Sequence, residues 1–331
     1  MASPSHLLVA NPTAQSGKNA ARIDRARRFL DGLGVAHDFL PTLPSGGTVA
    51  AVREALDGGT YATAIYMGGD GTFAEVAKGI LASKRKGAVR LAMLPTGTAN
   101  DQGKSFGLSA DEGALERNCR VVLAGLETRL DVGRLRRGKG RAAKDEYFFD
   151  SAGWGLSALV LARRNEDRAA VSQVPVLKEL WRDQLVYAGA LARSFLEPGL
   201  DGRKFDATVE ADGETFEWRG LLDLIVKATP VYGGAWVLDA SARHDDGKFE
   251  VVPFLGKRDF VAKAVTKLSA LGGLGLEPAK GVSARRIAID LSSADVAAQI
   301  DGEELPAARR FEIEVLAREL RLVVPAAHAA S

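Results

Sequence analysis

The stretch Tyr66-Met67-Gly68-Gly69-Asp70-Gly71-Thr72-Phe73-Ala74-Glu75 lies where an apolar run gives way to a helical pattern. Residues 62–65 before it are small or β-branched, which is typical of a short buried parallel strand. Apolar residues after it recur with the spacing of one helix face, at Phe73, Val76, Ala77, Ile80 and Leu81. The glycines are expected to permit a sharp turn, positive φ angles and the close approach of a bulky group. Because N–H groups at a helix N-terminus attract negative charge, the stretch predicts a phosphate site.

Two polar residues of this stretch have a purely structural interpretation as well. Thr72 followed three residues later by Glu75 matches a capping box, so both are expected to start the helix. Asp70 lies between glycines at the end of a strand, where packing makes no demand for a carboxylate. Asp70 is therefore interpreted as a functional residue.

Composition describes an ordinary globular chain. Its 331 residues suit two domains, with 46% hydrophobic and 26% charged residues and a net charge of +2, so nothing demands nucleic acid as a partner. The single cysteine, Cys119, cannot form an internal disulfide and is expected to be buried in a helix. No secretory signal pattern and no apolar run of about 20 residues is present, so a cytoplasmic protein with at most peripheral membrane contact is expected.

Strands and helices alternate in the first third of the chain. Strands are expected at residues 7–10, 35–40, 62–65 and 89–94, with helices from about residue 19, over 47–56 and after residue 72. This alternation predicts a parallel sheet with helices on both faces and ligands at the carboxyl ends of its strands. The turns rich in glycine and hydroxyl groups, at 11–18, 68–72 and 95–101, fall at that edge.

The pattern changes near residue 127. Strands are expected at 128–135, 146–153, 205–209, 216–227, 249–253 and 286–291, with a helix over 176–196. Asp-Gly turns between them predict an antiparallel second domain. A basic loop is expected to carry Arg134, Arg136, Arg137, Lys139, Arg141 and Lys144. It is interpreted as a solvated hairpin, with contact to anionic lipid headgroups as the alternative.

Several kinds of site are excluded by spacing. The four scattered histidines and one cysteine form no zinc pattern, and no G-x-S-x-G nucleophile motif is present. Ser16-Gly17-Lys18-Asn19 lacks the first glycine and the final hydroxyl of a Walker A loop. Any nucleotide therefore binds without a P-loop.

Six motifs together resemble the bacterial diacylglycerol kinase and lipid kinase family, which is related to sphingosine kinases and NAD kinases. They stand in the family's order over residues 7–325: Asn11-Pro12 with Gly17-Lys18, Gly68-Gly69-Asp70-Gly71-Thr72, Pro95-x-Gly97-Thr98-Ala99-Asn100-Asp101, Asp131-Val132-Gly133, Asp245-Asp246-Gly247 and Asp301-Gly302-Glu303. The resemblance implies a two-domain kinase with its active site in the cleft. Residues 1–127 would form the α/β nucleotide domain with a parallel sheet, and 128–318 a β-rich, mainly antiparallel lipid domain. Residues 319–331 would form a strand returning toward the first domain, followed by a tail.

The same resemblance implies roles for individual residues. ATP would contact Asn11, Pro12, Thr13, Thr42, Gly68, Gly69, Asp70, Gly71, Thr72, Phe73, Ala74 and Thr98. Asp70 and Asp101 would join a network that holds catalytic Mg²⁺ through water. A second divalent site would take the carboxylate of Asp246 and backbone oxygens of Arg243 and Lys248, although Asp246 and Asp301 alone predict only hairpin turns. Glu303 matches the family's general base, whereas the sphingosine kinases assign that role to the residue matching Asp70, so the base stays open between these two.

The function implied is transfer of the γ-phosphoryl group of ATP to a lipid hydroxyl, with diacylglycerol as the acceptor and phosphatidic acid as the product. The enzyme would work in the cytoplasm and transiently at the inner face of the membrane, with the oligomeric state, a homodimer included, left open. Departures from the family pattern lie at Ala74, at residues 150–157 and at Gly275-Leu276-Glu277. They leave three alternatives: a nucleotide-binding regulatory protein without turnover, a kinase for a sphingoid lipid, and a kinase for NAD.

Overall fold

The computed structural model divides the chain into two compact units. One unit comprises Met1–Asp131 and Arg318–Ser331, and the other comprises Val132–Ala317. The chain passes between them within two long strands, β5 (Glu127–Arg137) and β18 (Arg310–Val323). The structure describes residues 5–13, 18–97, 100–111, 113–138, 145–162, 203–232, 236–237, 242–256, 259 and 280–330.

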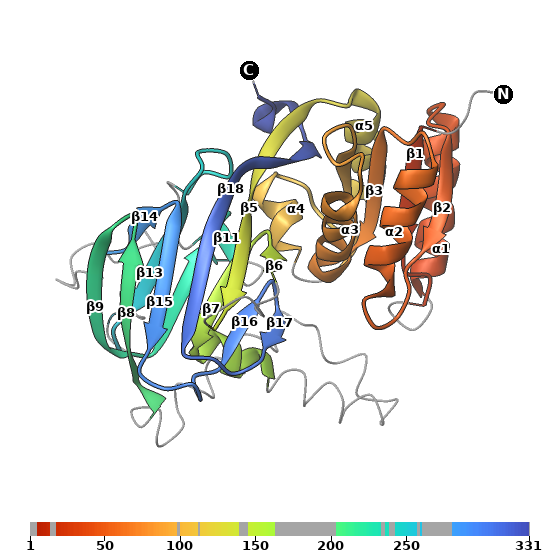
Figure 1. Ribbon diagram of the computed structural model, residues 1–331. Helices are drawn as coiled ribbons and strands as arrows, with labels where there is room; N and C mark the ends of the chain where they lie inside the picture. Colours follow the sequence, from red (N-terminus) through yellow and green to blue (C-terminus); the bar gives the residue numbers. More distant parts are fainter. Residues whose placement is uncertain are drawn as a thin grey trace. The chain divides into compact units, whose positions relative to one another are not determined.

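The first unit is built on a parallel sheet in the order β2-β1-β3-β4 (Figure 1). Its strands are β1 (His6–Ala10), β2 (His37–Pro41), β3 (Thr63–Gly68) and β4 (Arg90–Pro95). The helices that accompany them are α1 (Lys18–Gly32), α2 (Gly47–Gly58), α3 (Asp70–Ala82), the short α4 (Asp101–Ser105) and α5 (Ala114–Ala124). The alternation of strand and helix predicted from the sequence is confirmed.

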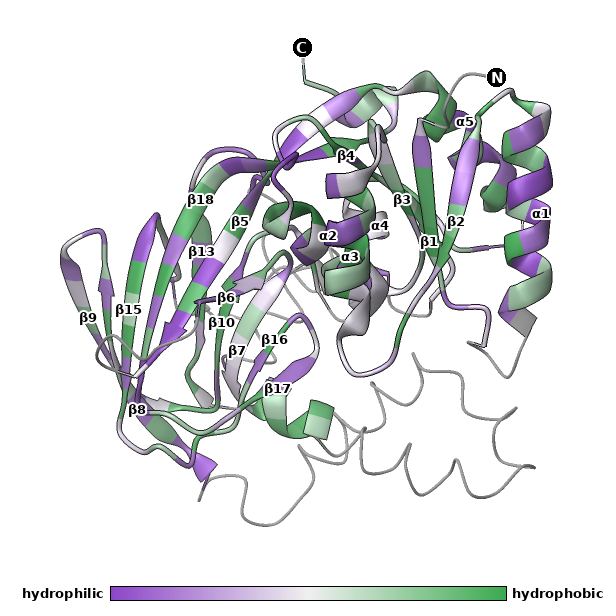
Figure 2. Cartoon of the chain, turned by 45° about the vertical axis from the view of Figure 1, so that its right-hand side comes forward, coloured by the Kyte–Doolittle hydropathy of each residue, from purple (hydrophilic) through white to green (hydrophobic). Residues whose placement is uncertain are grey.

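Burial explains why these segments form these elements. Every residue of β3 is buried, as expected for a central parallel strand covered on both faces. Helix α1 is amphipathic, with alternating purple and green along its length in Figure 2. It buries Ile23, Ala26 and Leu30 in a core shared with β1, β3, β4 and α5. Cys119 lies in that core, and burial together with Glu116 raises the pKa of its thiol to about 12.

The helix after the glycines begins earlier than the capping box predicts. Gly69 occupies the N-cap position in extended backbone, with φ −99° and ψ −170°, and no side chain caps the helix. The amide of Phe73 donates to the carbonyl of Gly69 at 3.0 Å, so Thr72 already lies inside the first turn. The prediction that Thr72 and Glu75 cap this helix is therefore wrong, because a glycine in extended backbone takes the cap position instead.

The C-terminal segment adds to the first unit. Leu322 of β18 pairs in parallel with Leu91 of β4, and the amide of Val324 donates to the carbonyl of Leu126 at 2.9 Å. A 3-10 turn, Ala326–His328, follows. β18, from the C-terminal end of the chain, is thus the fifth strand in the sheet order that starts at β2.

The second unit is a sandwich of two antiparallel layers. One layer continues the order β18-β15-β8-β9, with β5 and β6 paired beside it, and the other has the order β14-β13-β10-β7-β16-β17. The strands are β6 (Asp145–Phe148), β7 (Ser151–Gly155), β8 (Phe205–Ala211), β9 (Glu214–Leu221), β10 (Asp223–Lys227), β13 (Phe249–Phe254), β14 (Val282–Ala284), β15 (Arg286–Leu291), β16 (Ala298–Ile300) and β17 (Glu303–Leu305). A separate two-residue pair joins β11 (Val231–Tyr232) to β12 (Trp236–Val237).

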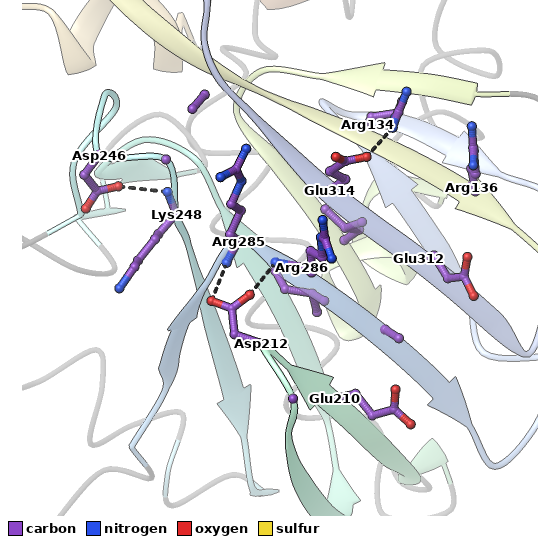
Figure 3. Close-up of a pocket in the computed structure, with 16 residues that line it drawn as sticks. Arg134, Arg136, Glu210, Asp212, Asp246, Lys248, Arg285, Arg286, Glu312 and Glu314 are labelled. Carbon is purple, nitrogen blue, oxygen red and sulfur yellow. Dashed lines mark hydrogen bonds and ion pairs between the residues drawn. The ribbon is translucent and has the colours of Figure 1, made fainter.

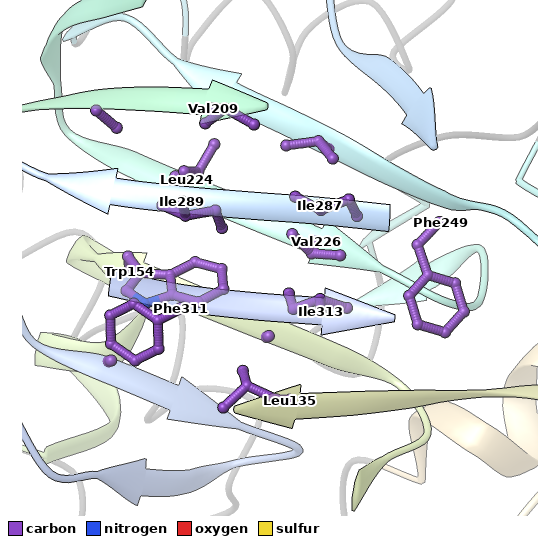
Figure 4. Packing of buried hydrophobic residues seen from close by; sticks show 14 of the residues in the cluster. Leu135, Trp154, Val209, Leu224, Val226, Phe249, Ile287, Ile289, Phe311 and Ile313 are labelled. Carbon is purple, nitrogen blue, oxygen red and sulfur yellow. The ribbon is translucent and has the colours of Figure 1, made fainter. Parts of the chain in front are cut away.

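Apolar side chains of both layers meet in one core, shown in Figure 4. Trp154 of β7 packs edge-on against Phe311 of β18, with ring centroids 5.2 Å apart. On β8 buried and exposed residues alternate strictly, as one buried face requires. The predicted antiparallel second domain is confirmed.

Two details of the second half differ from expectation. The single strand expected over 216–227 is two strands in different layers, because the backbone turns at Gly220, where φ is +67°, before β10 begins at Asp223. Arg134, Arg136 and Arg137 belong to β5 rather than to a loop, and they pair with Glu314, Asp145 and Glu146 respectively. Lys139, Arg141, Lys144, the helix expected over 176–196 and residues 275–277 lie outside the described residues. Within the described part of the chain, no helix is long and apolar enough to span a membrane.

Candidate functional site

The carboxyl ends of β1, β2, β3 and β4 lie at one edge of the sheet of the first unit, because these strands pair in parallel. The amide of Thr42, just after β2, donates to the carbonyl of Ala10 at the end of β1 at 2.9 Å. The amides of Thr96 and Gly97, just after β4, both donate to the carbonyl of Gly68 at the end of β3, at 2.8 and 3.1 Å. The described parts of the three predicted turns, at 11–13, 68–72 and 95–97, therefore lie at this edge. Ligands of such folds bind at this edge.

Close approach, rather than a special backbone angle, explains the glycines. None of Gly68, Gly69 and Gly71 has a positive φ, so that part of the expectation is wrong. A Cβ on Gly68 would lie 2.4 Å from the Thr72 hydroxyl oxygen, and a Cβ on Gly97 would lie 2.5 Å from the Cα of Gly69. The loops after β3 and β4 are thus in backbone contact. Gly71 has nothing within 4 Å of a Cβ position and is exposed, which leaves its backbone accessible.

The side chain of Asn100 fixes the loop after β4 through hydrogen bonds to Gly97. Asn100 lies in the left-handed region, with φ 51° and ψ 48°. Its side-chain oxygen accepts the amide of Gly97 at 3.0 Å, and its side-chain nitrogen donates to the carbonyl of Gly97 at 2.5 Å. Thr98 and Ala99, between these two residues, lie outside the described residues. An asparagine is among the few residues that adopt this conformation at low cost, which explains its place in the motif.

Two carboxylates begin the helices of this edge. Asp70 is the first residue of α3 and Asp101 the first of α4, and Asp101 is 8% exposed. The amide of Gln102 donates to a carboxylate oxygen of Asp70 at 3.3 Å, which brings the Asp70 side chain to the start of α4. A negative charge is stabilised at the N-terminus of a helix. Beneath Asp70 lies the buried Tyr66, whose pKa is raised by burial and by the Asp70 charge.

The remaining nucleotide residues expected in this unit are placed as follows. The side-chain oxygen of Asn11 accepts the amide and the hydroxyl of Thr13, at 2.9 and 2.8 Å, which shapes the turn through Pro12. Phe73 is 1% and Ala74 is 3% exposed, so their side chains face the core and only their backbone can reach a ligand. At the departure from the family pattern at position 74, the helix therefore contains an alanine packed in the core.

The second unit carries the other predicted acid–base residue, Glu303. Asp301 and Gly302 form a two-residue turn with φ angles of +46° and +81°, and Ile300 pairs with Glu303 across it. The Asp301 carboxylate accepts the amides of Phe149 and Asp150, both at 2.8 Å, and that of Ser151 at 3.1 Å. Glu303 is exposed at the start of β17. The turn is thus a hairpin, as its Asp-Gly sequence alone predicts, and its aspartate also holds a second turn at 149–151.

A buried ion pair supports this second turn. Lys227 of β10 is 1% exposed and donates to a carboxylate oxygen of Asp150 at 2.9 Å, and the hydroxyl of Thr229 donates to the same oxygen at 2.5 Å. Burial, together with the Asp150 charge, raises the pKa of Asp301 to about 7, although its three amide donors act in the opposite direction. Removing one partner from such a pair commonly costs about 3–5 kcal/mol, because it leaves a buried charge unpaired.

The Asp-Asp-Gly turn borders a pocket of about 1000 Å³ in the second unit. In this turn a carboxylate oxygen of Asp246 accepts the amide of Lys248 at 3.0 Å, and Arg243 pairs with Asp245. Figure 3 shows Asp246 and Lys248 on one side of the pocket, and Asp212 between Arg285 and Arg286, whose amides it accepts. The turn therefore lies at a wall of mixed charge.

The side-chain and backbone oxygen atoms at the two predicted metal sites determine which metal ion could bind there. Among the described residues, no group of three or more histidine, cysteine, aspartate or glutamate side chains is arranged so that it could hold a metal ion. Asp246 is exposed and follows the half-buried Asp245, while Gly247 has a φ of +78°. One carboxylate, backbone carbonyls and water are a ligand set that Mg²⁺ accepts, so the turn fits such an ion with few protein ligands. At the other site, Asp70 and Asp101 fit an ion held partly through water.

Some residues of these sites were missed by the sequence reasoning. Lys227 and Thr229 were not singled out, although a lysine ending the apolar run Asp223-Leu224-Ile225-Val226 is a signal of a paired buried charge. Asp131 was noted only within a motif, yet it is fully buried and accepts the amide of Arg318 at 2.6 Å.

Comparisons with known proteins agree on one family. Residues 5–135 match the diacylglycerol kinase catalytic domain. A relative in Pseudomonas aeruginosa PAO1, named "Probable lipid kinase YegS-like", is 31% identical over 295 residues, covering 86% of this chain and 83% of the relative. The Escherichia coli K12 protein "Lipid kinase YegS" is 26% identical over 287 residues, covering 86% and 85% of the two chains.

The fold has a counterpart among solved structures. A crystal structure of a diacylglycerol kinase from Bacillus anthracis strain Sterne aligns with a TM-score of 0.71 at 18% identity, covering 99% of both chains. At that identity the likeness concerns the fold, whereas the family rests on the sequence matches. The chain belongs to the family of YegS-like lipid kinases that carry the diacylglycerol kinase catalytic domain.

Proposed function

We propose that this lipid kinase transfers the γ-phosphoryl group of ATP to the hydroxyl of diacylglycerol and forms phosphatidic acid. The observation that supports it most is the paired glycine edge, where α3 begins directly after β3 and the Gly68–Gly69 backbone touches Gly97. Phosphoryl transfer needs backbone donors, a cation that neutralises charge and one carboxylate near the acceptor hydroxyl. The first turn of α3 would supply the backbone donors, Asp70 and Asp101 would hold the cation, and Glu303 would be the carboxylate near the acceptor.

Each part of the proposed site has a separate task. The first turn of α3, with the accessible backbone of Gly71, binds the phosphates through N–H groups at the helix N-terminus, where negative charge is favoured. Asp70 and Asp101 hold Mg²⁺ through water, and the ion, when bound, offsets the charge that develops on the transferred group. Thr13, Thr42 and Thr98 border the nucleotide. Glu303 accepts the proton of the acceptor hydroxyl, with Asp70 as the alternative base.

The Asp246 turn has a structural task in this proposal. An ion on Asp246 and the carbonyls of Arg243 and Lys248 would fix the chain ahead of β13, which begins at Phe249 in the core of the second unit. Work on a lipid acceptor places the enzyme transiently at the cytoplasmic membrane surface.

Incubation with γ-labelled ATP and a panel of acceptors, followed by thin-layer chromatography, tests the proposal. The panel contains diacylglycerol, a sphingoid base and NAD, each with Mg²⁺ and with a chelator in its place. We expect label in phosphatidic acid, dependent on Mg²⁺. Label only in the sphingoid lipid or in NAD would replace the acceptor. ATP binding in calorimetry without any labelled product would instead support a regulatory protein without turnover.

A further inference from the structure

The turn at 149–151 is held from two independent sides. On one side the Asp301 carboxylate accepts three consecutive amides, and the amide of Asp301 donates to the carbonyl of Ser151 at 2.9 Å. On the other side the amide of Ala228 donates to the carbonyl of Asp150 at 2.9 Å, next to the bonds from Lys227 and Thr229. Backbone and side chain of Asp150 are thus all engaged.

Lys227, Asp150, Thr229 and Asp301 form one cluster around this turn. Within it, Lys227 also contacts a further strand. Its ammonium group bonds Asp150 and also the carbonyl of Val231 at 2.7 Å. It therefore ties β10 both to the 149–151 turn and to the first residue of β11. The ammonium is almost completely excluded from water, and a lysine kept charged in such surroundings requires its partners.

The hairpin that carries Glu303 rests on this cluster. It has short strands, β16 with three residues and β17 with three, and β17 pairs only with β16 in the described sheet. Beyond the strand pairing with β7, its two-residue turn is fixed by the Asp301 carboxylate and by Gln299, whose side-chain oxygen accepts the amide of Gly302 at 2.9 Å. The two-residue turn of the hairpin, Asp301-Gly302, is therefore anchored on the turn at 149–151. Glu303 directly follows this two-residue turn.

We propose that Lys227, with Asp150 and Thr229, is a positioning residue for the acceptor side of phosphoryl transfer: it fixes the 149–151 turn on which Asp301 seats the hairpin of Glu303. The inference rests on the proposed function in one respect, namely that Glu303 acts on the acceptor hydroxyl. Lys227 itself touches no substrate in this account. Without it, Asp150 becomes an unpaired buried carboxylate close to Asp301, and repulsion between the two loosens the tip.

Three variants and one control separate positioning from general damage. Lys227→Met removes the charge and keeps the length of the side chain, and Thr229→Val removes only one hydrogen bond to Asp150. Asp150→Asn combined with Lys227→Met removes both charges together. Val209→Ala, in the core of the same unit but remote in the pairing order from β16 and β17, supplies destabilisation without touching the cluster.

We expect loss of Lys227 to lower kcat and to leave the KM for ATP unchanged. Lys227→Met should lower kcat by up to about 100-fold, the effect of a small misplacement of a catalytic group, with the KM for ATP unchanged. Thr229→Val should show the same pattern with a smaller decrease. The double variant should regain part of the kcat lost in Lys227→Met, and Val209→Ala should keep kcat while lowering the melting temperature.

Hydrogen exchange measured by mass spectrometry gives a readout that needs no turnover. In Lys227→Met, exchange should accelerate in peptides covering 299–305 and stay unchanged in peptides covering 63–82. If the wild-type enzyme phosphorylates no acceptor, the proposed function fails, and the exchange data alone decide whether Lys227 holds the hairpin. If Lys227→Met does not fold, Thr229→Val decides. Wild-type kcat in both single variants, unchanged exchange at 299–305, or an equal loss of kcat in Val209→Ala would overturn the inference.

Discussion

The glycine edge of the first unit, where Gly68, Gly69 and Gly97 meet, and the Asp301 hairpin of the second unit, formed by β16 and β17, are held by different kinds of contact. At the glycine edge, β3 and β4 end in backbone contacts between Gly68, Gly69 and Gly97, and the side chain of Asn100 adds two hydrogen bonds to Gly97. At the hairpin, the backbone turn at 149–151 is held by the buried side chains of Asp301, Asp150 and Lys227. The first arrangement depends on the close approach of two backbone segments, whereas the second binds backbone N–H groups to its own carboxylates.

This difference implies different sensitivities. The glycine edge should respond to added volume and hardly to pH, since Gly68, Gly69 and Gly97 contact uncharged backbone atoms and the neutral side chains of Thr72 and Asn100. The second unit contains carboxylates whose pKa values are raised, among them Asp301 and the 2%-exposed Asp223, so it should respond to pH and to neutral substitutions. Each prediction below tests one side of this contrast.

Outside the Lys227–Asp150 pair, the largest expected effect on stability is that of Asp223→Asn. Burial raises the pKa of Asp223 to about 7, while the hydroxyl of Ser157 donates to its carboxylate at 2.9 Å. Because the folded pKa is raised, the folded chain retains a proton between about pH 4 and 7 that the unfolded chain has released, so stability from this group is lost as pH rises through that range. At about 1.4 kcal/mol per unit, the loss approaches about 4 kcal/mol at pH 8 as an upper value. Asp223→Asn should therefore stabilise the second unit at pH 8 and change little at pH 4.

Tryptophan fluorescence during denaturation measures this change selectively. The chain has four tryptophans, none within 1–131 or 318–331, and the structure places Trp154 and Trp218 in strands of the second unit. Glu210→Gln on the exposed face of β8 serves as the control with the same change of charge. Equal stability curves of Asp223→Asn and wild type at pH 8 would show that Asp223 carries no buried charge.

A smaller effect is expected at the glycine edge, where two similar substitutions should diverge. Gly97→Ala places a methyl group 2.5 Å from the Cα of Gly69, which forces the two loops apart at a cost of about 1–3 kcal/mol. Gly71→Ala meets nothing within 4 Å and should leave stability equal or slightly higher, as alanine favours a helix. Circular dichroism during denaturation checks both, and neither difference should vary between pH 5 and 8.

Calorimetric titration with ATP tests whether Gly71 also contributes to nucleotide binding. Gly71→Ala should bind ATP about tenfold more weakly, equivalent to about 1.4 kcal/mol, because its methyl group stands where phosphate meets the first turn of α3. Gly58→Ala, near the end of α2 and also without neighbours within 4 Å, is the matched control and should bind normally. Unchanged affinity in Gly71→Ala would remove this turn from the nucleotide site.

The glycine edge could be predicted from the sequence because its signals are local. The turns after β1, β3 and β4 are each encoded within a few residues, and the parallel order of short strands brings them to one edge. What escaped prediction there is the contact between Gly69 and Gly97, which fixes the helix start at Asp70 and leaves Thr72 inside the helix.

The hairpin could not be predicted in the same way. Lys227 lies 77 residues from Asp150, and Asp301 lies 151 residues from it, so no local pattern links them. The Asp-Gly sequence at 301–302 predicts the turn, but the use of its carboxylate depends on the pairing of β16 with β7. Tertiary pairing thus decides which carboxylates are buried, and spacing alone carries no such information.

Steady-state kinetics of Glu303→Gln and Asp70→Asn, with varied ATP and Mg²⁺, test the central claim most directly, since that claim divides proton transfer and metal binding between the two units. Glu303→Gln should lower kcat about 10²–10⁴-fold, with the KM for ATP little changed, because a general base acts chiefly in the transition state. Asp70→Asn should also raise the Mg²⁺ concentration needed for half-maximal rate. A mild Glu303→Gln variant beside an inactive Asp70→Asn variant with normal Mg²⁺ dependence would contradict the account and assign the base to Asp70.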